Sequence, residues 1–414
     1  MAFYSDEKVK TEIIDPHLYV ANERVEFRLD SGTILNNLKV ANLGLTAAGN
    51  SKYNIDAGAL CVIKKISLFD GGVILQEQQN CNEHMAFMNN LESNAKNGNM
   101  DRFLKHHSLG LSIGAAVSDV STKSINILND EGTTVAAADS QANTIKGLIS
   151  VKELLPLVAK LSCLPSKVFP QLRLVIEFET DSRNLLKSTA NAATTTRPIL
   201  IVDKITDETT ENSLINQLES VNFMNYEYSN FNLPENTVGT QETNAKVMAF
   251  NNKMLNRLRL KYNLSNFQLE RDGNDDYKRG LLGSSHNHNN RAIQYRVNGA
   301  AVLPRSNLKG DMRRLAMLSD SWGAVNMSYE EPSTLAKTGA QNGLINLENK
   351  LNGSKDFDGV YVGKRVEELQ INISREFSAQ GAPNTLNAAT RVLVEGEVMK
   401  QFVISNGSYD VKYV

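Results

Sequence analysis

The chain has 414 residues, of which 41% are hydrophobic and 22% charged, and its formal net charge is −2. The balance of 44 Lys and Arg against 46 Asp and Glu excludes a strongly basic protein that coats nucleic acid or binds anionic lipid through its overall charge. At about 100–200 residues per domain, and more for β-rich folds, the length predicts two domains.

The N-terminal residues are charged, and no apolar run approaches the ~18–20 residues of a membrane span. We therefore expect no signal peptide, no spanning helix, and synthesis in host cytoplasm or a cytosol-like compartment. Three cysteines, Cys61, Cys81 and Cys163, are far apart and lack CxxC spacing. This pattern favours reduced, buried thiols over a disulfide framework or a zinc site.

Residues 1–16 are polar without clear periodicity, which predicts an N-terminal arm that becomes ordered on a neighbouring molecule. Strands follow from Val25, and two apolar runs flank Asp70-Gly71-Gly72, the strongest hairpin signal in the chain. Helical spacing of apolar residues predicts a short amphipathic helix within 80–96. The long polar region 97–146 is a loop of a size that usually has a function.

The centre of the chain combines a helix, a strand and a polar run. Ser150 and Glu153 have the spacing of a capping box for a helix that ends near Pro165. Apolar and charged residues then alternate over 172–179, which predicts a strand with one buried face. The low-complexity run STANAATTT has almost no bulky side chains, and we interpret 188–197 as a linker.

The second half repeats this pattern of strands, long loops and a helix. A large polar loop covers 268–292, a helix is predicted at 311–318, and the turn Asn406-Gly407 precedes a last strand. The other predicted strands are 198–202, 258–264, 293–303, 369–373 and 391–404.

No short repeat of ~20–50 residues is visible, which argues against a solenoid or propeller. The sequence predicts an all-β protein with two tandem jelly-roll β-sandwich domains, long loops and a few short helices. The predicted domains are the arm 1–16, a first jelly roll 17–187, the linker 188–197, and a second jelly roll 198–414.

Histidines and acidic clusters are the candidate metal ligands. The imidazoles that could converge on one ion are His106, His107, His286 and His288. No cysteine or spaced carboxylate set accompanies His286 and His288, and the Asp272–Asp276 stretch lacks the ligand spacing of a calcium loop, so solvated loops are favoured. The triplets Asn263-Leu264-Ser265 and Asn372-Ile373-Ser374 fall in predicted strands and are interpreted as chance glycosylation motifs.

Paired carboxylates are the candidates for acid–base chemistry on sugars. Glu395 and Glu397 fall on one face of a predicted strand, and we interpret them as an exposed strand face; Glu367 and Glu368 form a second pair. Two basic groups, Arg313-Arg314 and Arg257/Arg259/Lys261, are balanced by nearby acids and interleave with aliphatic residues, which argues against nucleic-acid binding.

Motifs for nucleophilic catalysis, phosphate binding and zinc proteases (GxSxG, the Walker glycine loop, GxGxxG after a strand, HExxH) do not occur. We therefore assign no catalytic, cofactor-binding or metal-binding residue and expect neither an enzyme nor a cofactor.

Three segments carry a resemblance to a known family: GALCVIKKISLFDGGVILQEQ, LPSKVFPQLRLVIEFE and the closing RVLVEGEVMKQFVISNGSYDVKYV. In these segments and in its layout the chain resembles the double jelly-roll major capsid proteins of tailless double-stranded DNA viruses, of the polinton-like virus and virophage type. The resemblance implies two upright jelly rolls per subunit, homotrimers that form pseudo-hexagonal capsomers, and an icosahedral virion shell built by self-assembly.

The implied partners are further copies of the chain and penton or minor capsid proteins, without sequence-specific nucleic acid; an internal membrane is left open. We expect the arm 1–16 and the loops 97–146 and 265–292 to form contacts or the outer surface. The alternative is a carbohydrate- or receptor-binding β-sandwich, for which the single Trp322 offers poor support, and a glycoside hydrolase comes third.

Overall fold

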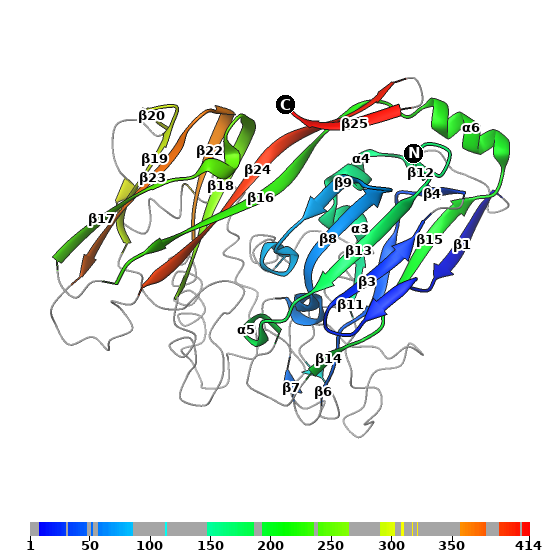
Figure 1. The fold of residues 1–414 in the computed structure, drawn as a ribbon, viewed down its shortest axis with the longest axis horizontal. Coiled ribbons are helices and arrows are strands. Elements are labelled where there is room, and N and C mark those ends of the chain that lie inside the picture. Colours follow the sequence, from blue (N-terminus) through cyan, green and yellow to red (C-terminus); the bar gives the residue numbers. More distant parts are fainter. Residues whose placement is uncertain are drawn as a thin grey trace, which may run out of the picture. The chain divides into compact units, whose positions relative to one another are not determined.

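The structure is a computed structural model that describes residues 8–29, 32–47, 51–52, 57–85, 112–113, 147–185, 193–235, 239–264, 290–302, 308–309, 317, 321, 357–377, 389–405 and 408–414. These residues form two compact units. The first unit comprises Met1–Met85, Asn97–Asn225 and Lys400–Lys412, and the second comprises Ala86–Lys96, Tyr226–Met399 and Tyr413–Val414. Most of the regular structure in these ranges is β-strand, with a few short helices, as Figure 1 shows.

One sheet of the first unit contains the hairpin and the central strand that the sequence predicts. Its order is β2-β3-β13-β8-β9, and all its neighbouring strands are antiparallel. The strands are β2 (Leu18–Val20), β3 (Arg24–Arg28), β8 (Ile63–Asp70), β9 (Val73–Gln78) and β13 (Leu172–Phe178). Gly71 connects β8 to β9 with a φ of 56°, a left-handed conformation that glycine adopts without strain.

The other main sheet of this unit has the order β11-β5-β15-β4-β12, with β1 paired to β15. Its strands are β1 (Val9–Ile14), β4 (Thr33–Leu35), β5 (Lys39–Leu43), β11 (Gly147–Ser150), β12 (Cys163–Pro165) and β15 (Ile199–Ile205). Small two-stranded sheets pair β6 (Leu45–Ala47) with β14 (Ala193–Thr195) and β7 (Ser51–Lys52) with β10 (Ser112–Ile113). The short helices are η1 (Gly58–Val62), α3 (Val151–Leu154), α4 (Pro156–Lys160), α5 (Ser182–Leu185) and α6 (Glu208–Asn216).

Alternation along the strands builds the core of the first unit. Leu172, Leu174 and Ile176 of β13 are fully buried. Glu177, the next residue after Ile176, is exposed. Because successive side chains point to opposite faces of a strand, this pattern places one face of the sheet on the core. Ile34, Val40, Leu200 and Val202 of the other sheet are also buried, so the unit is a β-sandwich.

The second unit is also a sandwich of two antiparallel sheets (Figure 1). One has the order β16-β24-β18-β22, with β25 paired to β24; the other has the order β17-β23-β19-β20, with β21 paired to β19. The elements are β16 (Val221–Leu233), β17 (Gly239–Lys246), η3 (Met248–Phe250), β18 (Lys253–Leu264), β19 (Asn290–Val297), β20 (Ala300–Ala301), β21 (Leu308–Lys309), β22 (Phe357–Val366), β23 (Leu369–Phe377), β24 (Thr390–Ser405) and β25 (Ser408–Tyr413). Of these strands, the start of β16, the end of β24 and most of β25 are counted with the first unit. Its core draws on both sheets, with Leu258, Val394, Tyr295 and Ile371 among its members.

The C-terminal segment belongs mostly to the first unit, although β24 begins in the second. Phe402 and Tyr409 pack on Phe169, with ring centroids 6.0 and 5.2 Å from it. The Tyr409 hydroxyl donates to Oδ2 of Asp70 at 2.6 Å, and the backbone N–H of Gln171 donates to Oδ1 of the same carboxylate at 2.7 Å. The aromatic contacts and these hydrogen bonds attach the end of the chain to the hairpin of β8 and β9.

The division into units lies later in the chain than the sequence predicts. The predicted linker 188–197 contains β14, and the predicted first strand of the second roll is β15, which pairs with β1, β4 and β5 of the first unit. The boundary therefore has to move from 198 to Asn225/Tyr226, with Lys400–Lys412 returning to the first unit. A run of small polar residues shows that its own side chains bury little surface. It does not show where one domain ends, because such residues can still pair as a strand, as Ala193–Thr195 do.

The N-terminal arm is a second correction. Residues Val9–Ile14 do not extend as an arm but pair along their length with β15 of the same chain. Backbone hydrogen bonds hold this edge strand even though its sequence, VKTEII, alternates poorly. Residues 1–7 lie outside the described residues.

Two smaller predictions also differ from the structure, at the helix predicted after Ser150 and at the strand predicted at 293–303. The Ser150 side chain makes no cap and donates to the Leu38 carbonyl at 3.4 Å, while Pro156 divides the predicted helix into α3 and α4. The predicted strand 293–303 turns at Asn298-Gly299, both with positive φ, and returns as β20. Of the helix predicted within 80–96, Cys81–Met85 are helical; of the helix predicted at 311–318, only Met317 is described.

Packing in the second unit gives a testable consequence at Gly396. A Cβ atom there would lie 2.3 Å from the Phe250 ring and 2.9 Å from Leu255. We expect Gly396→Ala to reduce the free energy of unfolding by about 1–3 kcal/mol, because the core has no room for a methyl group. Chemical denaturation measures this change. The control is Gly72→Ala, whose Cβ would meet nothing within 4 Å; equal effects of the two substitutions would contradict the packing.

Candidate functional site

The residues considered as metal ligands are not among those that the structure describes. His106, His107, His286, His288 and Asp272–Asp276 lie outside the described residues. Within the described ranges, no group of three or more His, Cys, Asp or Glu side chains could hold a metal ion. Cys61, Cys81 and Cys163 are buried thiols that form no disulfide, which confirms the prediction for these three residues.

The structure instead places charged residues of β18 and β24 in the interior of the second unit. The two strands pair so that Arg257 lies opposite Glu397 and Arg259 opposite Glu395. Glu395 and Glu397 are only 1% and 4% exposed, and the neighbouring Val394 and Val398 on the other face are fully buried. Both faces of this part of β24 are therefore covered.

Arg257 and Glu397 form a two-pronged ion pair. Nε of Arg257 donates to Oε2 of Glu397 at 2.7 Å, and Nη2 donates to Oε1 at 2.9 Å. The Asn256 amide and the Tyr226 hydroxyl also donate to the carboxylate, at 2.5 and 3.2 Å. Burial opposes the charge on Arg257, but the hydrogen bonds and charge of Glu397 outweigh it and hold the pKa of Arg257 above its ordinary value.

Arg259 and Glu395 form the neighbouring pair, which is almost inaccessible to solvent. Nη2 of Arg259 donates to Oε2 of Glu395. A buried carboxylate or guanidinium is tolerated only when it is paired and hydrogen-bonded, because desolvating an isolated charge is very costly. Within each pair, the positive charge of the arginine is balanced by the negative charge of the glutamate.

The prediction that Glu395 and Glu397 form an exposed strand face is wrong. A strand with alternating Val and Glu is typical of one dry and one wet face, and the sequence of β24 alone gives no sign of what covers its second face. The sequence feature that matches the two glutamates lies on β18, far away in the chain. There, Arg257 and Arg259 have the same two-residue spacing as Glu395 and Glu397. Glu368, by contrast, forms an ion pair with Lys246 and is 42% exposed at its side chain.

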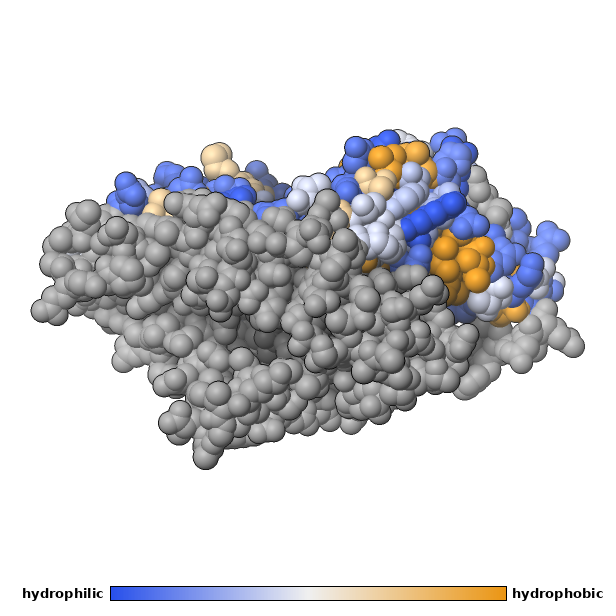
Figure 2. Space-filling model, turned by 90° about the horizontal axis from the view of Figure 1, so that it is seen from below, coloured by the Kyte–Doolittle hydropathy of each residue, from blue (hydrophilic) through white to orange (hydrophobic). Residues whose placement is uncertain are grey.

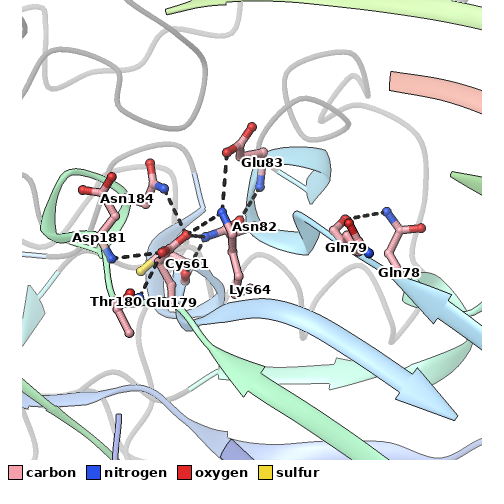
Figure 3. Close-up of polar contacts among 10 residues, drawn as sticks. All are labelled: Cys61, Lys64, Gln78, Gln79, Asn82, Glu83, Glu179, Thr180, Asp181 and Asn184. Atoms are coloured by element: carbon pink, nitrogen blue, oxygen red, sulfur yellow. Dashed lines mark hydrogen bonds and ion pairs between the residues drawn. The ribbon is translucent and has the colours of Figure 1, made fainter. Parts of the chain in front are cut away.

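A second polar cluster surrounds Glu179 in the first unit (Figure 3). Oε1 of Glu179 accepts hydrogen bonds from the backbone N–H groups of Thr180 and Asp181, both at 2.9 Å. Oε2 accepts from the amides of Asn82 and Asn184 at 2.9 and 3.0 Å and pairs with Nζ of Lys64 at 3.1 Å.

Burial at Glu179 disfavours its charge, but Lys64 and the hydrogen-bond donors outweigh burial and lower its pKa below the ordinary value. Every oxygen of this carboxylate is occupied by donors from the protein itself. The cluster therefore joins β8, β13, α5 and the helical turn Cys81–Met85, and its geometry fits a structural role better than acid–base catalysis.

We expect a buried ion pair of β18 and β24 to contribute more to the free energy of unfolding than an ion pair on the surface. We expect Glu397→Met to cost about 3 kcal/mol of unfolding free energy, because Arg257 loses its counter-charge while remaining largely buried. The double substitution Arg257→Met with Glu397→Met should cost less than the sum of the single substitutions, as a double-mutant cycle in chemical denaturation would show.

The matched control is Lys246 with Glu368, an exposed pair for which the same cycle should give a much smaller coupling energy, because solvent screens the two charges. Coupling energies of the same size in the two cycles would contradict the structural importance of the buried pair.

Comparison with known proteins gives a match at the level of structure alone. No family model and no curated protein sequence matches the chain. Three solved structures are similar over almost its whole length. PBCV-1 VP54, fitted into a cryo-EM reconstruction of the virophage Sputnik, has a TM-score of 0.56 and 12% identity, covering 100% of this chain and 99% of that chain. The Faustovirus major capsid protein has a TM-score of 0.54 and 8% identity, covering 98% and 92%.

The mavirus major capsid protein has a TM-score of 0.52 and 8% identity, covering 100% of this chain and 90% of that chain. At such identities the likeness establishes the fold. It confirms the predicted all-β architecture and the predicted pair of tandem jelly rolls. The chain has the double jelly-roll fold of these viral major capsid proteins.

Proposed function

We propose that the protein is a viral major capsid protein, a structural subunit that self-assembles into a virion shell. The observation that carries the proposal is the full-length match of its two sandwiches to major capsid proteins of Faustovirus and mavirus. A fold does not by itself fix a function, but here the match covers both rolls and their connection rather than one widespread domain.

In the proposed assembly, three copies form a capsomer. Two similar rolls per subunit give three subunits an outline close to six-fold, which suits packing in an icosahedral lattice. Homotrimers would tile the shell, with penton or minor capsid proteins as further partners. The loops 97–146 and 265–292 are proposed as contact or outer-surface regions; of these, only Ser112–Ile113 and residues 290–292 are described.

The described surface offers apolar residues for such contacts. Figure 2 shows separate hydrophobic patches among hydrophilic residues on the face that it views. Val73 and Ile74 are adjacent on the edge strand β9 and are 51% and 50% exposed. The large hydrophobic residues that are exposed in the described ranges are Ile13, Val73, Ile74, Met248, Tyr361, Tyr413 and Val414.

The polar clusters support a structural protein rather than an enzyme. The ion pairs of β18 and β24 and the Glu179 carboxylate are occupied by partners from the chain itself. None of the described helices is both long enough and apolar enough to cross a bilayer.

The oligomeric state tests the proposal. We expect size-exclusion chromatography with light scattering to give a mass of three times the 45.7-kDa chain or a larger assembly, and electron microscopy of this fraction to show particles with a six-fold-like outline. A monomer at every concentration would contradict the proposal. Glycan binding by such a monomer would favour the carbohydrate-binding alternative.

A further inference from the structure

The Glu179 cluster lies where several segments of the first unit meet. Glu179 directly follows β13, and the amides that bind it come from Asn82 in the helical turn Cys81–Met85 and from Asn184 in α5. The same Asn82 amide also donates to the Cys61 carbonyl in η1 at 3.1 Å. One carboxylate therefore joins the helical turn and α5 directly and, through the Asn82 amide, η1.

Two cysteines are part of this junction. The Cys61 thiol donates to the Leu185 carbonyl at the end of α5 at 3.3 Å, and the Cys81 thiol donates to the Gln78 carbonyl at 3.1 Å. Both side chains are fully buried. Cys163, also fully buried, lies in β12 of the other sheet and has no part in the cluster.

We propose that Glu179 is an acid-sensitive latch: protonation of its carboxylate releases the turn Cys81–Met85 and α5 from the end of β13 while the two sheets stay folded. A protonated carboxyl keeps at most one oxygen as a full acceptor for the five donors that now converge on the group, and it loses its attraction to Lys64. The proposal concerns a conformational change of the first unit and is independent of the capsid role.

The charged groups that face Glu179 come from three elements. Lys64 of β8 pairs with Glu179 and, at 3.8 Å, with Glu83 of the helical turn. Asp181, ahead of α5, lies close enough to act on the charge of Lys64. Burial lowers the pKa of Lys64, but Glu83, Glu179 and Asp181 outweigh it and raise this pKa above its ordinary 10.5, so Lys64 stays protonated in acid.

The direction of the pH dependence follows from these shifts. The pKa of Glu179 in the folded state lies below the ordinary 4.5, so its stabilising effect is complete above pH 4.5 and is lost as the pH falls below that value. The raised pKa of Lys64 affects stability only at pH values above 10.5. The latch is therefore closed at neutral pH and opens in acid.

The buried thiols report the opening site by site. The intact protein is incubated from about pH 7 to about pH 3 with a dithiodipyridine reagent, which reacts with thiols in acid, and each cysteine is quantified by peptide mass spectrometry. We expect the labelling rates of Cys61 and Cys81 to rise by up to about tenfold per pH unit below 4.5, with Cys163 protected and circular dichroism unchanged.

Two variants isolate Glu179 from a general effect of acid. Glu179→Gln, which is neutral at every pH, should label at Cys61 and Cys81 already at neutral pH and with little pH dependence. Glu177→Gln is the matched control, since Glu177 lies only two residues before Glu179, in β13, but is exposed and paired with Lys65 at 3.0 Å. It should behave like the unmodified protein.

The proposal would be overturned if all three thiols became reactive at the same pH, and if that pH were the one at which the circular dichroism signal is lost. Labelling of Glu179→Gln with the same pH profile as the unmodified protein would also overturn it. If Glu179→Gln fails to fold, the order in which the three thiols of the unmodified protein react decides the question alone.

Discussion

Burial on both faces of β24 is the constraint on which the second unit depends. In an ordinary sandwich strand one face is dry and the other is solvated, so charges on the second face need no partner. Here Glu395 and Glu397 are covered, and they are tolerated because Arg257 and Arg259 lie directly opposite them on β18. A slip of one residue would separate both ion pairs and turn the valines of β24 away from the core, so charge and apolar packing specify the same register.

The first unit uses charge differently. Its buried carboxylate, Glu179, does not fix the register of two long strands but joins a strand end to short helices. Many local donors satisfy this single acceptor, whereas in the second unit charges pair one to one across a ladder. The two sandwiches thus place their buried charges differently. In the first unit the charge lies where a strand end meets short helices, and in the second unit the charges lie in the middle of a sheet.

Local patterns predicted much of this structure from the sequence. The alternation at 172–179 and the Asp70-Gly71-Gly72 turn depend on nearest neighbours, and both are present in the structure. The burial of Glu395 and Glu397 could not be read in the same way, because it depends on what covers the second face of the sheet. The position of β15 likewise depends on pairing with β1 and β5, more than 150 residues away in the chain. The sequence offers Glu395, Glu397, Arg257 and Arg259 as separate candidates, but it does not show that they pair, since β18 and β24 are far apart in sequence.

The return of the C-terminal segment to the first unit has a consequence for biosynthesis. Phe169 is translated well before Phe402 and Tyr409, yet its ring cluster needs both of them. The first unit therefore cannot complete its packing on the ribosome when its own N-terminal strands emerge, and it must wait until the segment with Phe402 and Tyr409 has been made. The part of the protein that is made first is finished last, which delays its final form until the second unit has also been synthesised.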